Sequence, residues 1–185
     1  MIEPRDLVVL VDNFGRDLFN PDGTLSAIDK VEAHRRGLLH RATSVFIFND
    51  RDKLLIQRRA ENKYHSPNLW SNTCCTHPFP QEIPLVTAQR RLAEEMGLFV
   101  RLTEAFTFSY KVDVGSNLIE NEFDHVFFGF SNRDPVPDPA EVSGWAWVTL
   151  ENLEQELINN SDDYTPWLKI CFSEVVMARC SPRMR

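Results

Sequence analysis

Two short stretches of the chain carry residue types that can do proton chemistry. In Trp70–Pro78 (W-S-N-T-C-C-T-H-P), Cys75 and His77 lie two residues apart. In the later stretch I-E-N-E-F, Glu120 and Glu122 have the same spacing. Because residues two apart on an extended strand share a face, each pair can enter one pocket. We expect the two stretches to meet. They would form a metal site of nitrogen and oxygen ligands, with a thiol across the pocket from a carboxylate.

The elements that must position these residues are mostly strands. Short apolar or alternating runs predict strands at Leu7–Val11, Ala42–Phe48, Leu54–Arg58, Leu98–Leu102, Ala105–Val112, Ile119–Phe130 and Ser143–Val148. The turn signal N-D-R-D-K joins the second and third of these runs as a hairpin.

Between the strand patterns the period changes to that of a helix. Leu85, Ala88 and Leu92 recur at steps of three and four, with Pro84 at the start and Gly97 as a stop signal. Two further helices are predicted, at Leu150–Ile158 and from Thr165 to about Met177. The pattern predicts an α/β (α+β) fold, a curved mixed β-sheet flanked by helices, in one domain over residues 1–185.

Composition limits the classes of function. With 185 residues, 43% hydrophobic and 25% charged, the chain matches an ordinary soluble domain, and its net charge of −7 disfavours a nucleic-acid partner. No apolar run approaches the roughly 20 residues that span a bilayer. The first residues lack the regions of a signal peptide. Four cysteines, two of them adjacent, form no disulfide framework, so we expect a cytoplasmic protein. The oligomeric state is left open.

The segment from Glu82 to Leu98 can be written E-x7-R-R-L-A-E-E-M-G-L. It resembles the Nudix box, in which a loop and helix present carboxylates to magnesium bound on a diphosphate. The family usually has Gly at the position of Thr76 and Glu at that of Arg91. That glutamate belongs to the hydrolytic machinery, so the departure puts hydrolysis in doubt and leaves diphosphate binding intact.

Other motifs are similar to those of the type 1 isopentenyl-diphosphate isomerase family. They are the two stretches above, A-H-R-R-G-L-L-H-R-A at 33–42, the R-R-A stretch with its following lysine, and Y-T-P-W at 164–167. The resemblance runs in matching order from about Lys30 to Trp167. It implies a Nudix-like fold carrying a metal-dependent isomerase. Such an enzyme converts isopentenyl diphosphate to dimethylallyl diphosphate by protonation and deprotonation through a tertiary carbocation.

The resemblance assigns a divalent metal to three imidazoles and two carboxylates, namely His34, His40, His77, Glu120 and Glu122. This donor set suits zinc or manganese, with magnesium as a lower-affinity alternative. A lone histidine is more often structural. The metal prediction therefore depends on the three histidines occurring together with the two pairs spaced two residues apart, Cys75/His77 and Glu120/Glu122. His65 and His125 match no ligand position and are expected to be structural.

The resemblance also assigns the proton transfers. Glu122 and Cys75 are the expected acid/base groups, with Glu122 protonating the alkene and Cys75 removing the second proton, although the order can be reversed. Tyr110 is expected to bond to Glu122 and relay its proton, with an ordinary strand residue as an equal alternative. Trp167 is expected to stabilise the cation with its indole face. Cys74 should point to the opposite face.

The diphosphate should be bound by Lys30, Arg59, Lys63 and Arg91. Glu95 should hold a magnesium ion bridging the diphosphate to the protein. The resemblance implies that residues 1–29 complete the site.

Two rival functions remain open. A Nudix hydrolase of a nucleoside or other diphosphate would share the fold and differ in chemistry. An inactive diphosphate-binding module would need none of the acid, base and metal residues. Arg91 argues against the hydrolase, and the intact set argues against the binding module.

Overall fold

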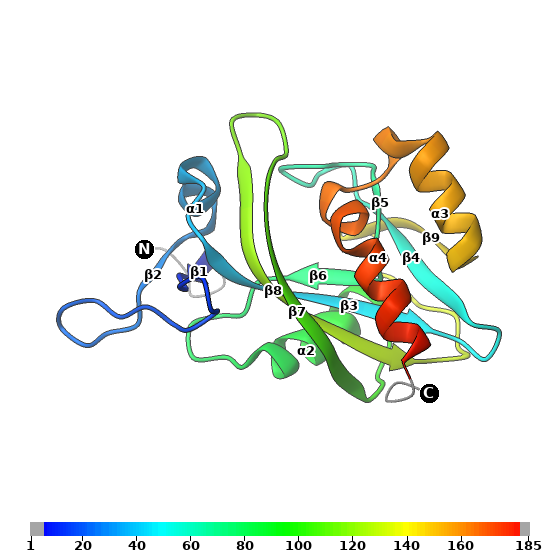
Figure 1. Ribbon diagram of the computed structural model, residues 1–185, viewed down its shortest axis with the longest axis horizontal. Coiled ribbons are helices and arrows are strands. Elements are labelled where there is room, and N and C mark those ends of the chain that lie inside the picture. The colour runs from blue at the N-terminus through cyan, green and yellow to red at the C-terminus, as the bar shows by residue number, and fades with distance from the viewer. Residues whose placement is uncertain (1–5, 182–185) are drawn as a thin grey trace.

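A mixed β-sheet dominates the computed structural model, which describes residues 6–181 (Figure 1). In this part of the chain the sheet has seven strands. They are β3 (His40–Phe48), β4 (Lys53–Arg59), β5 (Trp70–Ser71), β6 (Cys74–Thr76), β7 (Leu102–Asp113), β8 (Ile119–Phe130) and β9 (Val142–Thr149). A separate two-stranded sheet pairs β1 (Leu7–Val9) with β2 (Ala27–Asp29).

Four α-helices accompany the strands in residues 6–181. They are α1 (Lys30–Arg36), α2 (Pro84–Met96), α3 (Leu150–Asn159) and α4 (Pro166–Cys180), with a 3-10 turn at Ser161–Asp163. Within that range, none of the helices has both the length and the apolar character that a bilayer crossing demands.

Strand β3 organises the sheet because it has three partners. It runs parallel to β8 along its whole length, whereas the other strand pairings within residues 6–181 are antiparallel. It pairs with β4 only at Ile47 and Phe48. Nearer its start, β6 occupies the same edge over Thr43–Val45. The sheet therefore forks, and the fork places the Cys75 segment beside the first half of β3, with β8 on the other edge of β3.

Helices cover both faces of the sheet, and the alternation of side chains along β3 explains why. Phe46 and Phe48 pack with α4 and α3 on one face, while Val45 and Ile47 pack with α2 on the other. All four are buried. The predicted α/β architecture with a curved mixed sheet flanked by helices is confirmed, and the predicted strands at 119–130 and 143–148 lie where expected.

One local prediction was wrong and one helix was missed. The strand predicted over Leu98–Leu102 is absent from residues 98–101: Gly97 ends α2 in the left-handed conformation (φ 65°), and the carbonyl of Met96, the last residue of α2, accepts from the Val136 amide. Helix α1 was not predicted. It is only seven residues long, and it is stabilised by its ends: the Asp29 carboxylate accepts from the Glu32 amide, and Gly37 closes it with φ 57°.

Candidate active site and metal centre

Strand register brings one row of polar residues together. Across the sheet, Tyr110 of β7 lies opposite Glu122 of β8, and Glu122 lies opposite His40 of β3. Residues opposite one another on neighbouring strands have Cβ atoms about 4.5–5.5 Å apart. This arrangement depends on parallel pairing of β3 with β8, which joins residues 82 positions apart in the sequence.

The Cys75 segment enters the same face through β6. Cys75 lies opposite Ser44 of β3, and His77 follows the last residue of the strand. Its neighbour Cys74 is fully buried on the other face, where it packs with Ala88 and Leu92 of α2. The two adjacent thiols therefore face different sides of the sheet, as expected.

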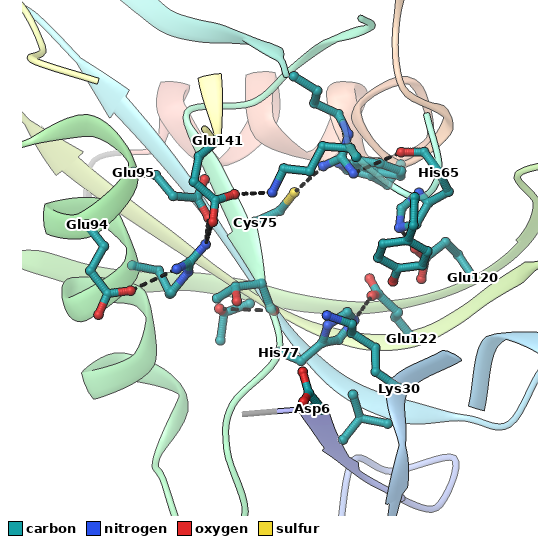
Figure 2. A pocket seen from close by; sticks show the side chains of 18 of the residues that line it. Asp6, Lys30, His65, Cys75, His77, Glu94, Glu95, Glu120, Glu122 and Glu141 are labelled. Carbon is teal, nitrogen blue, oxygen red and sulfur yellow. Dashed lines mark hydrogen bonds and ion pairs between the residues drawn. The ribbon is translucent and has the colours of Figure 1, made fainter. Parts of the chain in front are cut away.

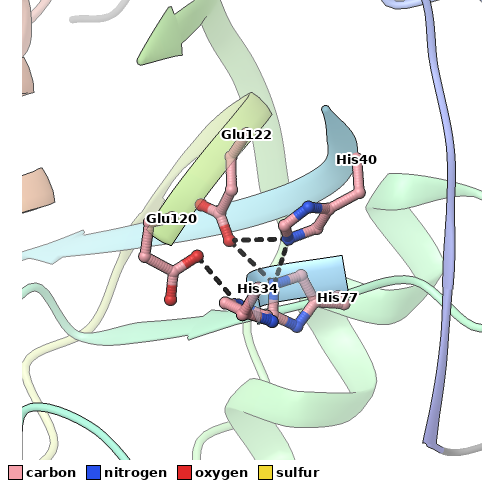
Figure 3. Close-up of side chains that lie close together, drawn as sticks. All are labelled: His34, His40, His77, Glu120 and Glu122. Carbon is pink, nitrogen blue, oxygen red and sulfur yellow. Dashed lines mark hydrogen bonds and ion pairs between the residues drawn. The ribbon is translucent and has the colours of Figure 1, made fainter. Parts of the chain in front are cut away.

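The five expected metal ligands converge on one point (Figure 3). His34, His40, His77, Glu120 and Glu122 each offer one ligand atom, and these atoms all lie within 4.8 Å of one another.

The hydrogen bonds of these imidazoles test whether a cation fits among them. His34 Nδ1 lies 2.5 Å from the Lys30 carbonyl and His40 Nδ1 lies 2.8 Å from the Leu38 carbonyl. A carbonyl only accepts, so both Nδ1 atoms carry hydrogen and the Nε2 atoms of the neutral rings carry lone pairs. Yet His34 Nε2 lies 3.0 Å from Glu120 Oε2, another acceptor.

Two more contacts lie at the same point: His40 Nε2 is 3.2 Å from His77 Nε2, which is 2.7 Å from Glu122 Oε1. Between His34 Nε2 and Glu120 Oε2 a lone pair faces a lone pair at 3.0 Å, and this contact requires a proton or a metal ion between the two atoms. A buried group of three imidazoles and two carboxylates is a donor set for a divalent transition metal, so the residues fit such an ion.

Burial and neighbouring charges determine which of these side chains are protonated. Burial lowers the pKa of His77 to about 4, which keeps the ring neutral. Burial alone would raise the pKa of Glu120, but hydrogen bonds from His34 and His65 outweigh it and leave the pKa well below its usual range. Burial also opposes the charge on His34, but the Glu120 carboxylate raises its pKa overall. In the absence of a metal, a proton therefore takes the place between His34 and Glu120.

A cavity of about 670 Å³ opens above the metal-ligand cluster (Figure 2). The expected site residues that line it are Lys30, Arg59, Lys63, Cys75, His77, Arg91, Glu95, Tyr110, Glu120, Glu122 and Trp167. Of the segment expected to complete the site, Asp6, Leu7 and Val8 line this cavity, and residues 1–5 lie outside the described residues.

Cys75 and Glu122 lie on different walls of this cavity. Burial raises the pKa of the Cys75 thiol to about 12, although Arg59, whose Nη1 lies 3.9 Å from Sγ, acts to lower it. The thiol is thus protonated at neutral pH. Glu122 is ionised, since the neighbouring His40 and His77 imidazoles lower its pKa against the effects of burial and Glu120. One wall holds a proton and the other can accept one.

Tyr110 and Trp167 are both held by hydrogen bonds. The Tyr110 hydroxyl donates to Glu122 Oε2 at 2.6 Å. The Trp167 indole N–H lies 3.0 Å from Ser71 Oγ and 3.2 Å from Asn72 Oδ1, and the residue is 4% exposed. The Arg59 guanidinium lies 5.2 Å from the centre of the indole ring, so a cation already occupies its neighbourhood.

The basic end of the cavity is balanced by carboxylates. Arg91 bonds to Glu95 at 2.5 Å and to Glu141 at 3.0 Å, and Glu141 also pairs with Lys63. Lys30 Nζ lies 5.3 Å from the centre of the Tyr64 ring. Glu95 is buried beside Arg91 and lies outside the five-residue cluster.

Sequence reasoning missed several residues that line this cavity, and two of them, His65 and Glu141, contact predicted site residues. His65, expected to be structural, lies 3.0 Å from Glu120 Oε1 and lines the cavity. The sequence signal that could have placed His65 in the cavity was its position two residues after Lys63, a predicted site residue. Glu141 follows a proline-rich loop and belongs to no recognised motif, so the sequence carried no signal for its contacts with Lys63 and Arg91.

Comparisons with known proteins agree with this geometry. The family model described as "NUDIX domain" matches residues 38–168. A curated protein of Aromatoleum aromaticum named "Isopentenyl-diphosphate Delta-isomerase 1" is 47% identical over 98% of this chain and 98% of its own length. One of Pectobacterium atrosepticum, named "Isopentenyl-diphosphate Delta-isomerase", is 44% identical over 93% and 92%.

Solved structures share the fold at low identity. The DR0079 protein of Deinococcus radiodurans superimposes with a TM-score of 0.69 at 21% identity, over 85% of this chain and 96% of that one. A MutT protein of Methanosarcina mazei superimposes with a TM-score of 0.64 at 18% identity, over 77% and 96%.

The forked mixed sheet, the carboxylate-bearing helix α2 and the matching domain model define a Nudix protein. Within that superfamily, the identity over nearly the full length decides the branch: the chain belongs to the type 1 isopentenyl-diphosphate Delta-isomerase family.

Proposed function

We infer that this protein converts isopentenyl diphosphate to dimethylallyl diphosphate. The observation that carries the inference is the pairing of a protonated thiol, Cys75, with an ionised carboxylate, Glu122, on different walls of one cavity. The names of relatives at 44–47% identity support it independently.

The proposed chemistry needs one proton added and one removed. A proton goes to C4, the C3=C4 electron pair forms the new C–H bond, and C3 becomes a tertiary cation. Loss of a proton from C2 then forms the C2=C3 double bond. Cys75 and Glu122 supply the donor and the acceptor, and the Tyr110 hydroxyl, bonded to Glu122, carries the proton onward. The pKa directions favour Cys75 as the donor, the reverse of the order expected from the sequence.

The cation at C3 is the costly species on this path. Trp167 presents a buried indole to the cavity, and a desolvated indole attracts a cation by about 2 kcal/mol or more. Its N–H is bonded to Ser71 and Asn72, so the ring is held in place before the substrate arrives.

The diphosphate is assigned to the basic end. Lys30, Arg59, Lys63 and Arg91 all line the cavity and offer ammonium and guanidinium donors to phosphate oxygens. Glu95 is the proposed ligand of the magnesium ion that accompanies the substrate.

The five-residue cluster is the proposed site of a zinc or manganese ion. When bound, such an ion supplies positive charge that holds both glutamates ionised and fixes their geometry. Glu122 then has one oxygen toward the cluster and the other toward Tyr110.

The alternative, a Nudix hydrolase, shares this fold and these carboxylates. It is disfavoured because Arg91 occupies the position of the usual catalytic glutamate and is bonded to Glu95 and Glu141. We further propose that residues 1–185 act as a single domain. We also propose that the protein works in the cytoplasm, where a free thiol such as Cys75 stays reduced.

Incubation with isopentenyl diphosphate decides between these functions. We expect dimethylallyl diphosphate to form with no release of phosphate. Release of phosphate would establish the hydrolase, and binding without either product would establish a binding module.

A further inference from the structure

His65 differs from His34 and His40 of the metal-ligand cluster in which ring nitrogen carries its hydrogen. Its Nε2 lies 3.0 Å from Glu120 Oε1, and a carboxylate only accepts, so this nitrogen carries the hydrogen. Its Nδ1 lies 3.4 Å from the Ser66 hydroxyl, which can donate to it. His65 is therefore a satisfied donor to Glu120, whereas the contact of His34 Nε2 with the other oxygen of Glu120 needs a proton or a metal ion between them.

The carboxylate of Glu120 is held between these two rings. Oε1 receives the His65 hydrogen bond and Oε2 faces His34, at 3.0 Å each. All three side chains are no more than 6% exposed, so water cannot take over either bond.

The backbone holds His65 rigidly in this position. Arg59 donates from Nη2 to the His65 carbonyl and from Nε to the Ser66 carbonyl, at 3.1 Å each. The ring also meets the Trp167 indole edge-on, with centroids 5.8 Å apart and an interplanar angle of 78°. His65 thus touches the cluster on one side and the indole on the other.

We propose that His65 is a positioning residue: its hydrogen bond fixes one oxygen of Glu120 so that the other is presented to a divalent metal. The proposal rests on the proposed function, since it takes the five-residue cluster as a metal site. Partners that orient a ligand in this way commonly raise metal affinity by about 10–100-fold.

Three variants test the proposal on metal-free protein, with Zn²⁺ affinity measured by competition against a chromophoric chelator. His65→Leu removes the donor. His65→Gln places an amide N–H near the position of Nε2, and His65→Asn places one near Nδ1. We expect the Leu and Asn variants to bind Zn²⁺ about 10–100-fold more weakly and the Gln variant to recover most of the loss. His125→Leu is the matched control, because His125 makes the same 3.0 Å contact with Glu104 at the surface.

A second readout separates positioning from simple packing. Turnover should fall with metal occupancy in the Leu variant and return at saturating Zn²⁺, while the KM for substrate stays near that of the wild type. Wild-type zinc affinity in all variants would overturn the proposal, as would a Gln variant as weak as the Leu variant. A wild-type protein that binds Zn²⁺ but produces no isomer refutes the proposed function alone. If His65→Leu fails to fold, the comparison of Gln with Asn still decides.

Discussion

The two oxygens of Glu122 have different neighbours, and this division underlies the proposed mechanism. Oε1 lies 2.7 Å from His77 and 3.6 Å from His40, in the metal-ligand cluster, whereas Oε2 accepts from Tyr110 at 2.6 Å. One carboxylate can therefore serve the metal and the substrate at the same time. Cys75 is not one of the proposed metal ligands, so replacing it tests the proton transfer without changing the metal site.

Replacing Cys75 with Ser should lower turnover by about 10²–10⁴-fold, the usual contribution of a general acid–base step. A hydroxyl fills similar space but gives up its proton far less readily than a thiol. The measurement is kcat for dimethylallyl diphosphate formation, with circular dichroism to confirm folding. Cys180→Ser, an exposed thiol at the end of α4, is the control and should keep wild-type turnover. Normal turnover in Cys75→Ser would exclude the thiol as an acid/base group.

Trp167 should act on the transition state rather than on substrate binding. Trp167→Phe keeps a weaker aromatic face and should retain part of the activity. Trp167→Leu keeps an apolar side chain but has no aromatic face, and turnover should fall by roughly 10²-fold or less. An ammonium analogue of the cation should lose affinity in parallel. A packing role predicts instead that thermal stability falls in both variants while the folded protein turns over normally.

At the scale of elements, sequence periodicity predicted the long strands and helices, whose patterns lie within one continuous segment. The alternation over 119–130 located β8, and the apolar steps with Gly97 located α2, because both patterns are long enough to be unambiguous. Helix α1 was missed because its seven residues are stabilised by caps and tertiary contacts rather than by a periodic face. The fork of the sheet at β3 leaves no local signature either, since it depends on which distant strands pair.

The loop between His77 and α2 depends on one carboxylate. Glu82 accepts two bonds from Arg90 at 2.9 Å each and one from the Phe79 amide at 3.2 Å. The Arg90 hydrogen bond lowers the pKa of Glu82 from its ordinary 4.5 to about 2. A lowered pKa in the folded state means that the stabilisation is present above pH 4.5 and is lost as the pH falls toward 2.

Glu82→Gln should therefore destabilise the protein at pH 7 by about 1 kcal/mol, the typical worth of such a bond. The difference from wild type should shrink as the pH is lowered below 4.5, because the wild-type carboxyl then becomes neutral too. Urea unfolding of both proteins at a series of pH values measures this. A difference that stays constant with pH would show that Glu82 acts through shape rather than charge.

At the scale of the whole molecule, an acidic protein has a cationic end in its cavity. The net charge is −7, yet Lys30, Arg59, Lys63 and Arg91 line one pocket. Spacing and resemblance predicted these cations, because each lies in a recognisable stretch. Spacing and resemblance did not predict Glu141. Its contacts form only because the loop after Pro139 folds back against α2 and the end of β4.

A diphosphate that enters the cavity would compete with Glu141 for the same two cations. The Glu141 carboxylate pairs with both Lys63 and Arg91, the cations assigned to the substrate, and its own pKa is lowered by those contacts against the effect of burial. Like charges repel, so the diphosphate must weaken these pairs as it enters. The Glu141 backbone is held beside the end of β4 by the bond from the Ala60 amide to the Glu141 carbonyl, which keeps this residue at the basic end of the cavity.

Glu141→Gln keeps the shape and one accepting oxygen but removes the charge. Partly exposed ion pairs are worth about 0.2–1 kcal/mol each, so inorganic diphosphate should bind about 2–5-fold more tightly to the variant. Isothermal titration without magnesium measures this effect, and raised salt should reduce it. Glu94→Gln is the matched control, because Glu94 also bonds to Arg91, at 2.8 Å, but its side chain is 46% exposed and should matter less. Weaker binding in Glu141→Gln would mean that this carboxylate holds Lys63 and Arg91 in the geometry that the diphosphate needs, rather than competing for them.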